Sequence, residues 1–161
     1  MIEFFESRTR EHIDRVGQCL EAVAVTHSLA AELRARIPIH DASKFGSEER
    51  EPYIWLTEFH RCRRRGEPFE YPPGVADRVT AAVDHHVRHN RHHPECHAHP
   101  DAMSEVDLIE MVCDWTAMAL EYDQGSARPW ADRTVGTKLI LAPSNVVVIY
   151  DAIDVLERRW R

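Results

Sequence analysis

Apolar residues recur every three or four positions along most of the chain, the spacing of helices that each bury one face. The first such segment predicts a helix over about residues 6–36, and Pro38 interrupts the pattern after it. His12 adjoins the apolar positions of this segment, so we expect its ring to face the interior. A polar ring on an inward face needs a partner.

More helices are predicted downstream, and a proline, a glycine or a capping residue marks each start. These starts are Ser47, Gly74, Ser104 and Pro143. Residues 135–141 fit either a helix or a buried strand. The last helix, about residues 144–161, carries an apolar face with which to pack on the rest. The pattern predicts a single all-α domain over residues 1–161, a bundle of five to seven helices.

Composition and charge narrow the possible partners of the chain. The formal net charge of −7 gives no electrostatic reason to expect a nucleic-acid polymer as partner. No segment approaches the roughly 20 apolar residues that span a bilayer, so no membrane partner is expected. The N-terminus has acids where a signal peptide has bases, and the four cysteines form no CxxC pair, which together favour a cytoplasmic protein. An exposed Trp160 on the last helix would suit a homodimer.

Histidine is the residue in which the composition departs from the ordinary. The chain has 11 histidines, and seven of them lie within residues 85–99. The adjacent pair His40-Asp41 offers one imidazole nitrogen and one carboxylate oxygen to a divalent metal ion. Asp114 lies among the apolar residues of a predicted helix, where a carboxylate is costly unless it is paired or bound to a metal. We therefore expect these residues to form one metal centre.

The order His … His-Asp … His … Asp on a helical scaffold resembles the HD-domain superfamily of metal-dependent phosphohydrolases. The chain is most similar to a bacterial and phage branch with a His-Asp-x-Ser-Lys-Phe core, then Asn-x-His-His, then Glu-Met-Val-x-Asp-Trp. Here those motifs read His40–Phe45, Asn90–His93 and Glu110–Trp115. The resemblance covers about residues 8–118.

The resemblance implies a set of roles for named residues. Its metal ligands fall on His12, His40, Asp41 and Asp114, with His86 and His93 added if two divalent ions are bound. Their neighbours His85 and His92 remain alternatives, and His27 competes with His12 but lies too near His40 in sequence. Lys44 is expected to contact a phosphate oxygen in catalysis, Glu110 to orient a ligating histidine, and Asn90 and His92 to bind substrate.

The resemblance implies hydrolysis of a small phosphorylated molecule, with a nucleotide as the expected substrate, by metal-activated water. One feature opens an alternative. Many nucleotide-cleaving HD enzymes have an acid where this chain has Lys44. The motif His-Asp-x-x-Lys resembles two other groups, the cyclic-dinucleotide phosphodiesterases of the HD-GYP kind and the HD-fold diiron oxygenases. A third interpretation is a non-catalytic helical binding protein that a metal ion stabilises.

Overall fold

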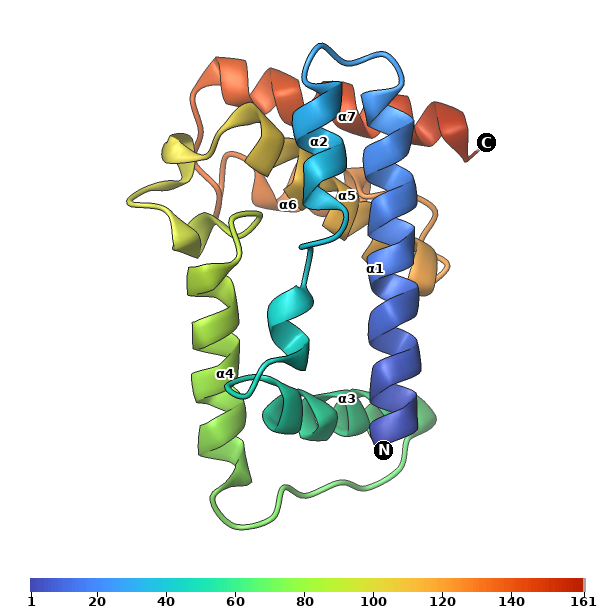
Figure 1. The fold of residues 1–161 in the computed structure, drawn as a ribbon, viewed down its shortest axis with the longest axis vertical. Coiled ribbons are helices and arrows are strands. Elements are labelled where there is room, and N and C mark those ends of the chain that lie inside the picture. The colour runs from blue at the N-terminus through green and yellow to red at the C-terminus, as the bar shows by residue number, and fades with distance from the viewer. Residues whose placement is uncertain (161) are drawn as a thin grey trace.

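The computed structural model describes residues 1–160, which form an all-α bundle (Figure 1). This part of the chain has seven α-helices, within the predicted range. They are α1 (Ile2–Ala24), α2 (Ala30–Arg36), α3 (Arg50–Arg65), α4 (Val75–His89), α5 (Glu105–Glu121), α6 (Arg128–Thr134) and α7 (Pro143–Arg159). Three short 3-10 helices join them, namely η1 (Ala42–Phe45), η2 (Pro94–Cys96) and η3 (Pro100–Ala102).

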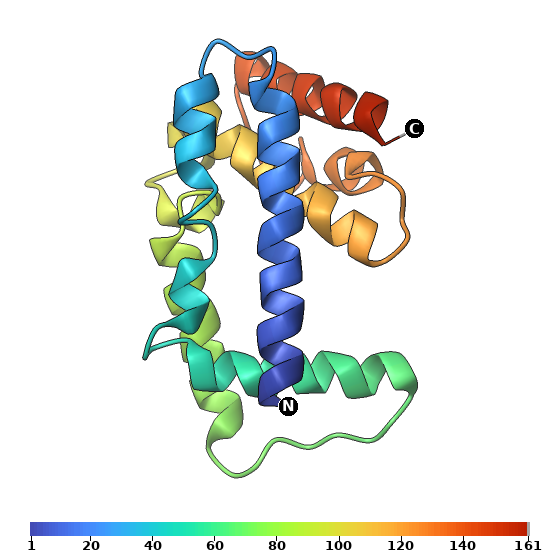
Figure 2. The same cartoon turned by 45° about the vertical axis from the view of Figure 1, so that its right-hand side comes forward.

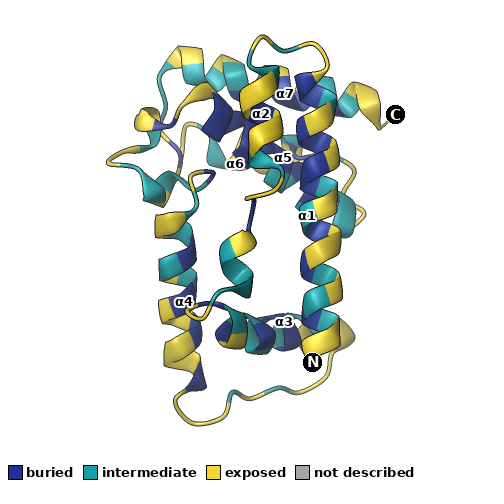
Figure 3. Ribbon diagram, viewed as in Figure 1, coloured by how far each residue is buried: buried dark blue, intermediate teal, exposed yellow. Residues whose placement is uncertain are grey.

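Helix α1 runs along the length of the molecule, with α3 crossing it near the N-terminus and α7 near its other end (Figures 1 and 2). Helix α5 packs on α1, α2 and α7 and carries the largest share of the core. Buried positions gather on the faces where these helices meet (Figure 3). The apolar spacing read from the sequence thus marks real packing faces. Among the described residues, no helix is long and apolar enough to cross a membrane.

The prediction of one helix over residues 6–36 was wrong, because α1 ends at Ala24 and α2 begins at Ala30. The polar residues between them form a turn in which His27 Nδ1 accepts a hydrogen bond from the backbone N–H of Leu29. Such local bonds let a side chain compete with the helix for backbone groups. The break turns α2 back against α1, and the chain that follows places Asp41 Oδ2 3.5 Å from Nε2 of His12 on α1.

The two predicted serine caps differ in outcome. Ser104 caps α5 as expected, since its hydroxyl accepts from the N–H of Asp107 at 3.2 Å and Asp107 accepts from the Ser104 N–H at 3.0 Å. Ser47 does not cap the next helix, which begins at Arg50, and its hydroxyl donates instead to Glu48. The residue before α3 is Glu49, whose side chain points inward to histidines.

The region between α5 and α7 also differs from expectation. Residues 128–134, expected partly as loop, form α6. Residues 135–141 form neither a helix nor a strand, and only an isolated bridge joins Val135 to Leu139. Gly136 has a φ of +78°, a left-handed conformation that suits a tight turn and that glycine adopts without strain.

Candidate metal centre

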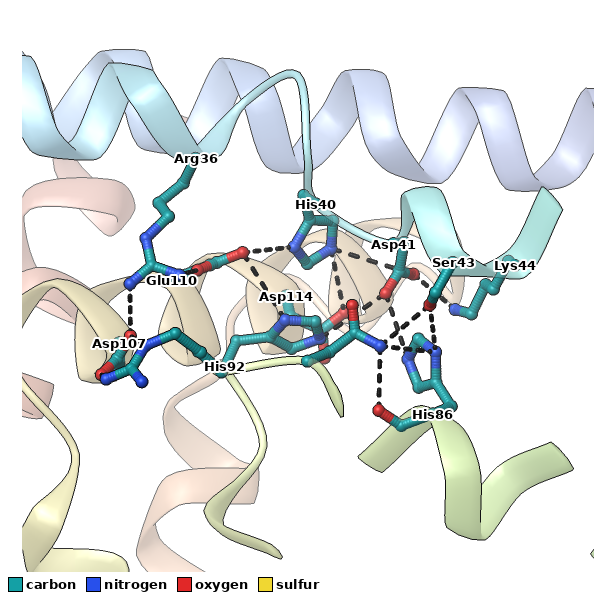
Figure 4. A network of polar contacts seen from close by, with 12 residues as sticks. Arg36, His40, Asp41, Ser43, Lys44, His86, His92, Asp107, Glu110 and Asp114 are labelled. Atoms are coloured by element: carbon teal, nitrogen blue, oxygen red, sulfur yellow. Dashed lines mark hydrogen bonds and ion pairs between the residues drawn. The ribbon is translucent and has the colours of Figure 1, made fainter. Parts of the chain in front are cut away.

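The predicted ligands come from five separate segments whose side chains lie close together. Figure 4 shows His40, Asp41, His86 and Asp114 of this set, together with His92. His12 lies on α1, Asp114 on α5 and His86 on α4. His40 and Asp41 lie between α2 and η1, and His92 and His93 follow α4 in an irregular segment. Three overlapping groups of these side chains have donor atoms within 4.8 Å of one another, namely His12/His40/Asp41, His40/His92/Asp114 and His86/His92/His93.

Asp41 stands between two sets of imidazoles. Its Oδ2 lies 3.5 Å from His12 Nε2 and 3.9 Å from His40 Nε2. Its Oδ1 lies 3.2 Å from His86 Nε2 and 3.6 Å from His92 Nε2. One carboxylate thus presents an oxygen to each set, which is the arrangement that a ligand bridging two metal ions requires.

The backbone of Asp41 is held in an uncommon conformation. Its φ of +55° is in the left-handed region, which aspartate tolerates better than most residues at a cost of about 1–2 kcal/mol. Such conformations persist where the surrounding structure fixes them, and they cluster at functional sites. Here the bend points the carboxylate, which is almost fully buried, at the histidines.

The donor set fits a divalent metal ion. Within residues 1–160, three buried atoms from three different candidate ligands make no hydrogen bond of ordinary geometry, namely His12 Nε2, His40 Nε2 and Asp41 Oδ1, and His12 Nδ1 also makes none. A buried polar atom without a partner costs about 1–3 kcal/mol, so three together call for a binding partner. Imidazole nitrogen and carboxylate oxygen are the ligands of Zn, Mn, Fe, Co and Ni sites.

Asp114 meets the cluster from α5. Its Oδ1 lies 3.0 Å from His12 Nε2 and 3.9 Å from His40 Nε2. The full burial expected from its apolar neighbours is not found, because its side chain remains 19% exposed at one side. Burial opposes its ionisation, but the close approach of His12, together with the nearby His92 and His40, outweighs it and lowers the pKa of the carboxyl group. Asp114 is therefore an ionised candidate ligand that also borders open space.

Glu110 lies behind the histidines, one turn of α5 before Asp114. Its Oε1 is 2.9 Å from His40 Nδ1 and 3.5 Å from His92 Nδ1. Burial opposes ionisation, yet the hydrogen bonds with His40 and His92 lower the pKa of Glu110 to about 2. A carboxylate on Nδ1 fixes the tautomer and leaves Nε2 as the metal donor.

Glu49 does the same for His86. It is completely buried, and its Oε2 lies 2.8 Å from His86 Nδ1 while its Oε1 lies 2.8 Å from His85 Nδ1. Ser43 donates a further hydrogen bond to it at 3.0 Å. His86 is thereby oriented with Nε2 toward Asp41. The adjacent candidate His85 contacts the other oxygen of Glu49, and its side chain is 33% exposed.

The neighbouring pair His92 and His93 is brought into the centre together. His92 is buried and contributes to two of the three donor groups, whereas His93 joins only the group with His86. Burial, and next the neighbouring His92, lower the pKa of His93 to about 3, so that its ring is neutral. His92 is therefore better placed than His93 to bind a metal ion, because it belongs to two of the three groups and His93 belongs to one.

Lys44 and Asn90 are close to the centre but already have partners. The Lys44 ammonium contacts Asp41 Oδ2 and lies 5.3 Å from the centre of the Tyr53 ring. The Asn90 amide donates to Ser43 Oγ at 2.9 Å and to the His86 carbonyl at 2.8 Å. Asn90 thereby holds the end of α4 against η1, and its expected contact with substrate stays a prediction.

Sequence reasoning missed the ion pairs that hold Glu110 in place. Arg36 on α2 contacts both Asp107 and Glu110, and Arg91 binds Asp107 through two hydrogen bonds. Asp107 is fully buried. Its spacing of three residues from Glu110 on an otherwise apolar helix was the available signal, since two buried acids on one helix require cations.

A comparison with protein-family models matches residues 1–154 to DUF5662, described as a family of unknown function. The chain belongs to this family. No curated protein and no solved structure matches the chain.

Proposed function

We propose that this protein is a metal-dependent phosphohydrolase of the HD type that acts on a small phosphorylated molecule. The observation that supports this most strongly is Asp41, whose two oxygens face two separate sets of imidazoles. The set His12, His40, Asp41 and Asp114 would hold one divalent ion, and His86, His92 and the shared Asp41 would hold a second. His93 would complete the second set from its edge.

Bound divalent ions would polarise a phosphoryl oxygen and supply a hydroxide nucleophile at neutral pH. The protein's own residues supply the rest. Glu110 and Glu49 hold the histidine tautomers, which keeps Nε2 free for the metal. Lys44 contacts the Asp41 carboxylate, and from this position its ammonium group would bind a phosphate oxygen of the substrate.

Other features agree with this proposal. The four cysteines Cys19, Cys62, Cys96 and Cys113 are free thiols, as suits a reducing, cytoplasmic setting. The partner we propose is a small molecule. A homodimer through the last helix also stays a proposal, and Trp160 there is 38% exposed.

The test is phosphate release by the purified chain after reconstitution with Mn²⁺, Co²⁺, Ni²⁺ or Zn²⁺. We expect release from phosphate monoesters and at least a 1,000-fold loss in Asp41→Asn, which keeps the size of the side chain but removes its bridging charge. Asp101→Asn is the matched control, since Asp101 bonds only to the start of α7 and should leave the rate unchanged. Failure of every metal form to release phosphate would refute the proposal.

A diiron oxygenase is the second candidate, because the same five imidazoles and two carboxylates suit two iron ions. Fe²⁺-dependent oxygen uptake that Mn²⁺ does not support would favour it. Phosphate release with Mn²⁺ and no oxygen uptake with Fe²⁺ would exclude it.

A further inference from the structure

A cavity of about 770 Å³ opens directly beside the metal centre. His92, His93 and Asp114 belong both to the centre and to the wall of this cavity. Its volume is that of a site for a small organic molecule. A phosphoryl group bound at the centre would therefore have the rest of its molecule in this space.

One wall of the cavity is a face of α5. Asp114, Trp115, Met118 and Tyr122 succeed one another at helical spacing and all line it. From Asp114 to Tyr122 the helix rises by about 12 Å, which is long enough for an alcohol that carries one ring system. Trp130 and Thr134 of α6 and the following Leu139 contribute further lining.

The aromatic side chains of this lining are exposed to an unusual degree. Trp130 is 49% exposed and Tyr122 is 37% exposed. Trp115 is only partly buried, whereas the aliphatic residues of the same helix are mostly buried. Indole and phenol rings offer flat π-faces on which a planar ring stacks, whatever its hydrogen-bonding edge. The cavity thus offers stacking surface rather than a dense set of polar contacts.

The charges around the cavity limit the number of phosphate groups that a bound molecule can carry. Among the described residues, Lys138 is the only lysine or arginine in its lining, and Glu95 and Asp114 are acids. Arg36 and Arg91 bind Asp107, and the Arg133 guanidinium lies 5.9 Å from the centre of the Trp130 ring. A di- or triphosphate chain would bring several negative charges to a lining with one ammonium group and two carboxylates, which favours a single phosphate.

We propose that this cavity binds the alcohol portion of a phosphate monoester that carries a planar ring and a single phosphate. The inference rests on the proposed function for the position of the phosphate. The ring site itself follows from the lining of the cavity and can be tested apart from catalysis.

The first experiment compares substrates that differ in one part only. Metal-loaded protein is assayed with adenosine 5′-monophosphate, ribose 5-phosphate and adenosine 5′-triphosphate. We expect kcat/KM for the monophosphate to exceed that for ribose 5-phosphate at least tenfold, mostly through KM, and to exceed that for the triphosphate. Equal or better use of ribose 5-phosphate, or a preference for the triphosphate, would overturn the inference.

The second experiment needs no catalysis and so separates the two proposals. Binding of adenosine and of uridine to metal-free protein is measured by calorimetry for wild type, Trp130→Ala, Trp130→Phe and Trp160→Ala. We expect about a tenfold weaker Kd for Trp130→Ala, near wild-type binding for Trp130→Phe, and no change for Trp160→Ala, which lies outside the cavity.

The outcomes distinguish the two failures. Binding of a nucleoside that depends on Trp130, together with no phosphate release from any ester, would retain the ring site and refute the hydrolase. Phosphate release without nucleoside binding, or binding that is insensitive to Trp130→Ala, would refute the ring site and retain the hydrolase.

Discussion

Replacing Glu110 by glutamine removes one negative charge from behind the metal centre and keeps the size of the side chain. In the native chain Glu110 accepts from His40 Nδ1 and contacts His92 Nδ1 and Arg36. A glutamine amide accepts such bonds more weakly and allows either tautomer of the imidazole. We expect the variant to bind divalent metal ions about 10- to 100-fold more weakly, which is the usual effect of losing a carboxylate that supports a metal-binding histidine.

The magnitude for the metal-free protein follows from the pKa of Glu110. A fall from the ordinary 4.5 to about 2 corresponds to about 3 kcal/mol in favour of the ionised carboxylate in the folded state. Because the pKa is lowered on folding, this stabilisation is present above about pH 4.5 and is lost as the pH falls toward 2. At pH 7 Glu110→Gln should therefore lose up to about 3 kcal/mol.

The assay is metal titration by calorimetry beside urea unfolding, with Glu121→Gln as control. Glu121 is also on α5 and pairs with Arg8, yet has no contact with a candidate ligand in the described chain. We expect the control to lose stability and keep its metal affinity. Wild-type metal affinity in Glu110→Gln, or an equal loss of affinity in Glu121→Gln, would refute the reasoning.

Three further predictions concern the surroundings of the centre. Glu49→Gln should weaken metal binding by His86 and leave binding by His12 and His40 intact. The metal content measured by mass spectrometry should then fall by about one ion per chain. Lys44→Met removes an ammonium group from Asp41, so it should raise the affinity for divalent ions in a metal titration and lower the rate of phosphate-ester turnover. Faster turnover together with weaker metal binding would contradict this. Asp107→Asn should lower the free energy of unfolding at pH 7 by on the order of 2 kcal/mol and reduce its acid dependence. Burial opposes ionisation of Asp107, but bonds from Arg91 and Ser104 lower its pKa, so its stabilisation is lost as the pH falls below the ordinary 3.8; an unchanged urea midpoint would contradict this.

The helical architecture was predictable because each long helix buries one face, and apolar spacing records that face directly. The start of α5 at Ser104 was predictable for a similar reason, because a capping box depends only on two residues three positions apart. The break after Ala24 was missed because a bond from a local backbone N–H to His27 decides it, and no change in apolar spacing marks such a bond.

The site was predictable as a set of residues but not as an arrangement. The spacing of His40, Asp41 and Asp114 carried the pattern, and the structure brings all three together with His12. Which side His92 and His93 face depends on backbone angles in an irregular segment, where His93 has a φ of −100° and a ψ of 132°. Periodicity gives no information there. The burial of Glu49 was equally invisible, since an acid before a helix is ordinarily explained by the helix dipole.

The proposed two-ion site is tested most directly by the metal content of tag-free protein after reconstitution, measured by mass spectrometry for wild type and Asp41→Ala. We expect about two divalent ions per wild-type chain and loss of both in the variant, because Asp41 offers an oxygen to each set of histidines. A wild-type chain that takes up no metal, or an Asp41→Ala chain that keeps two ions, would contradict it.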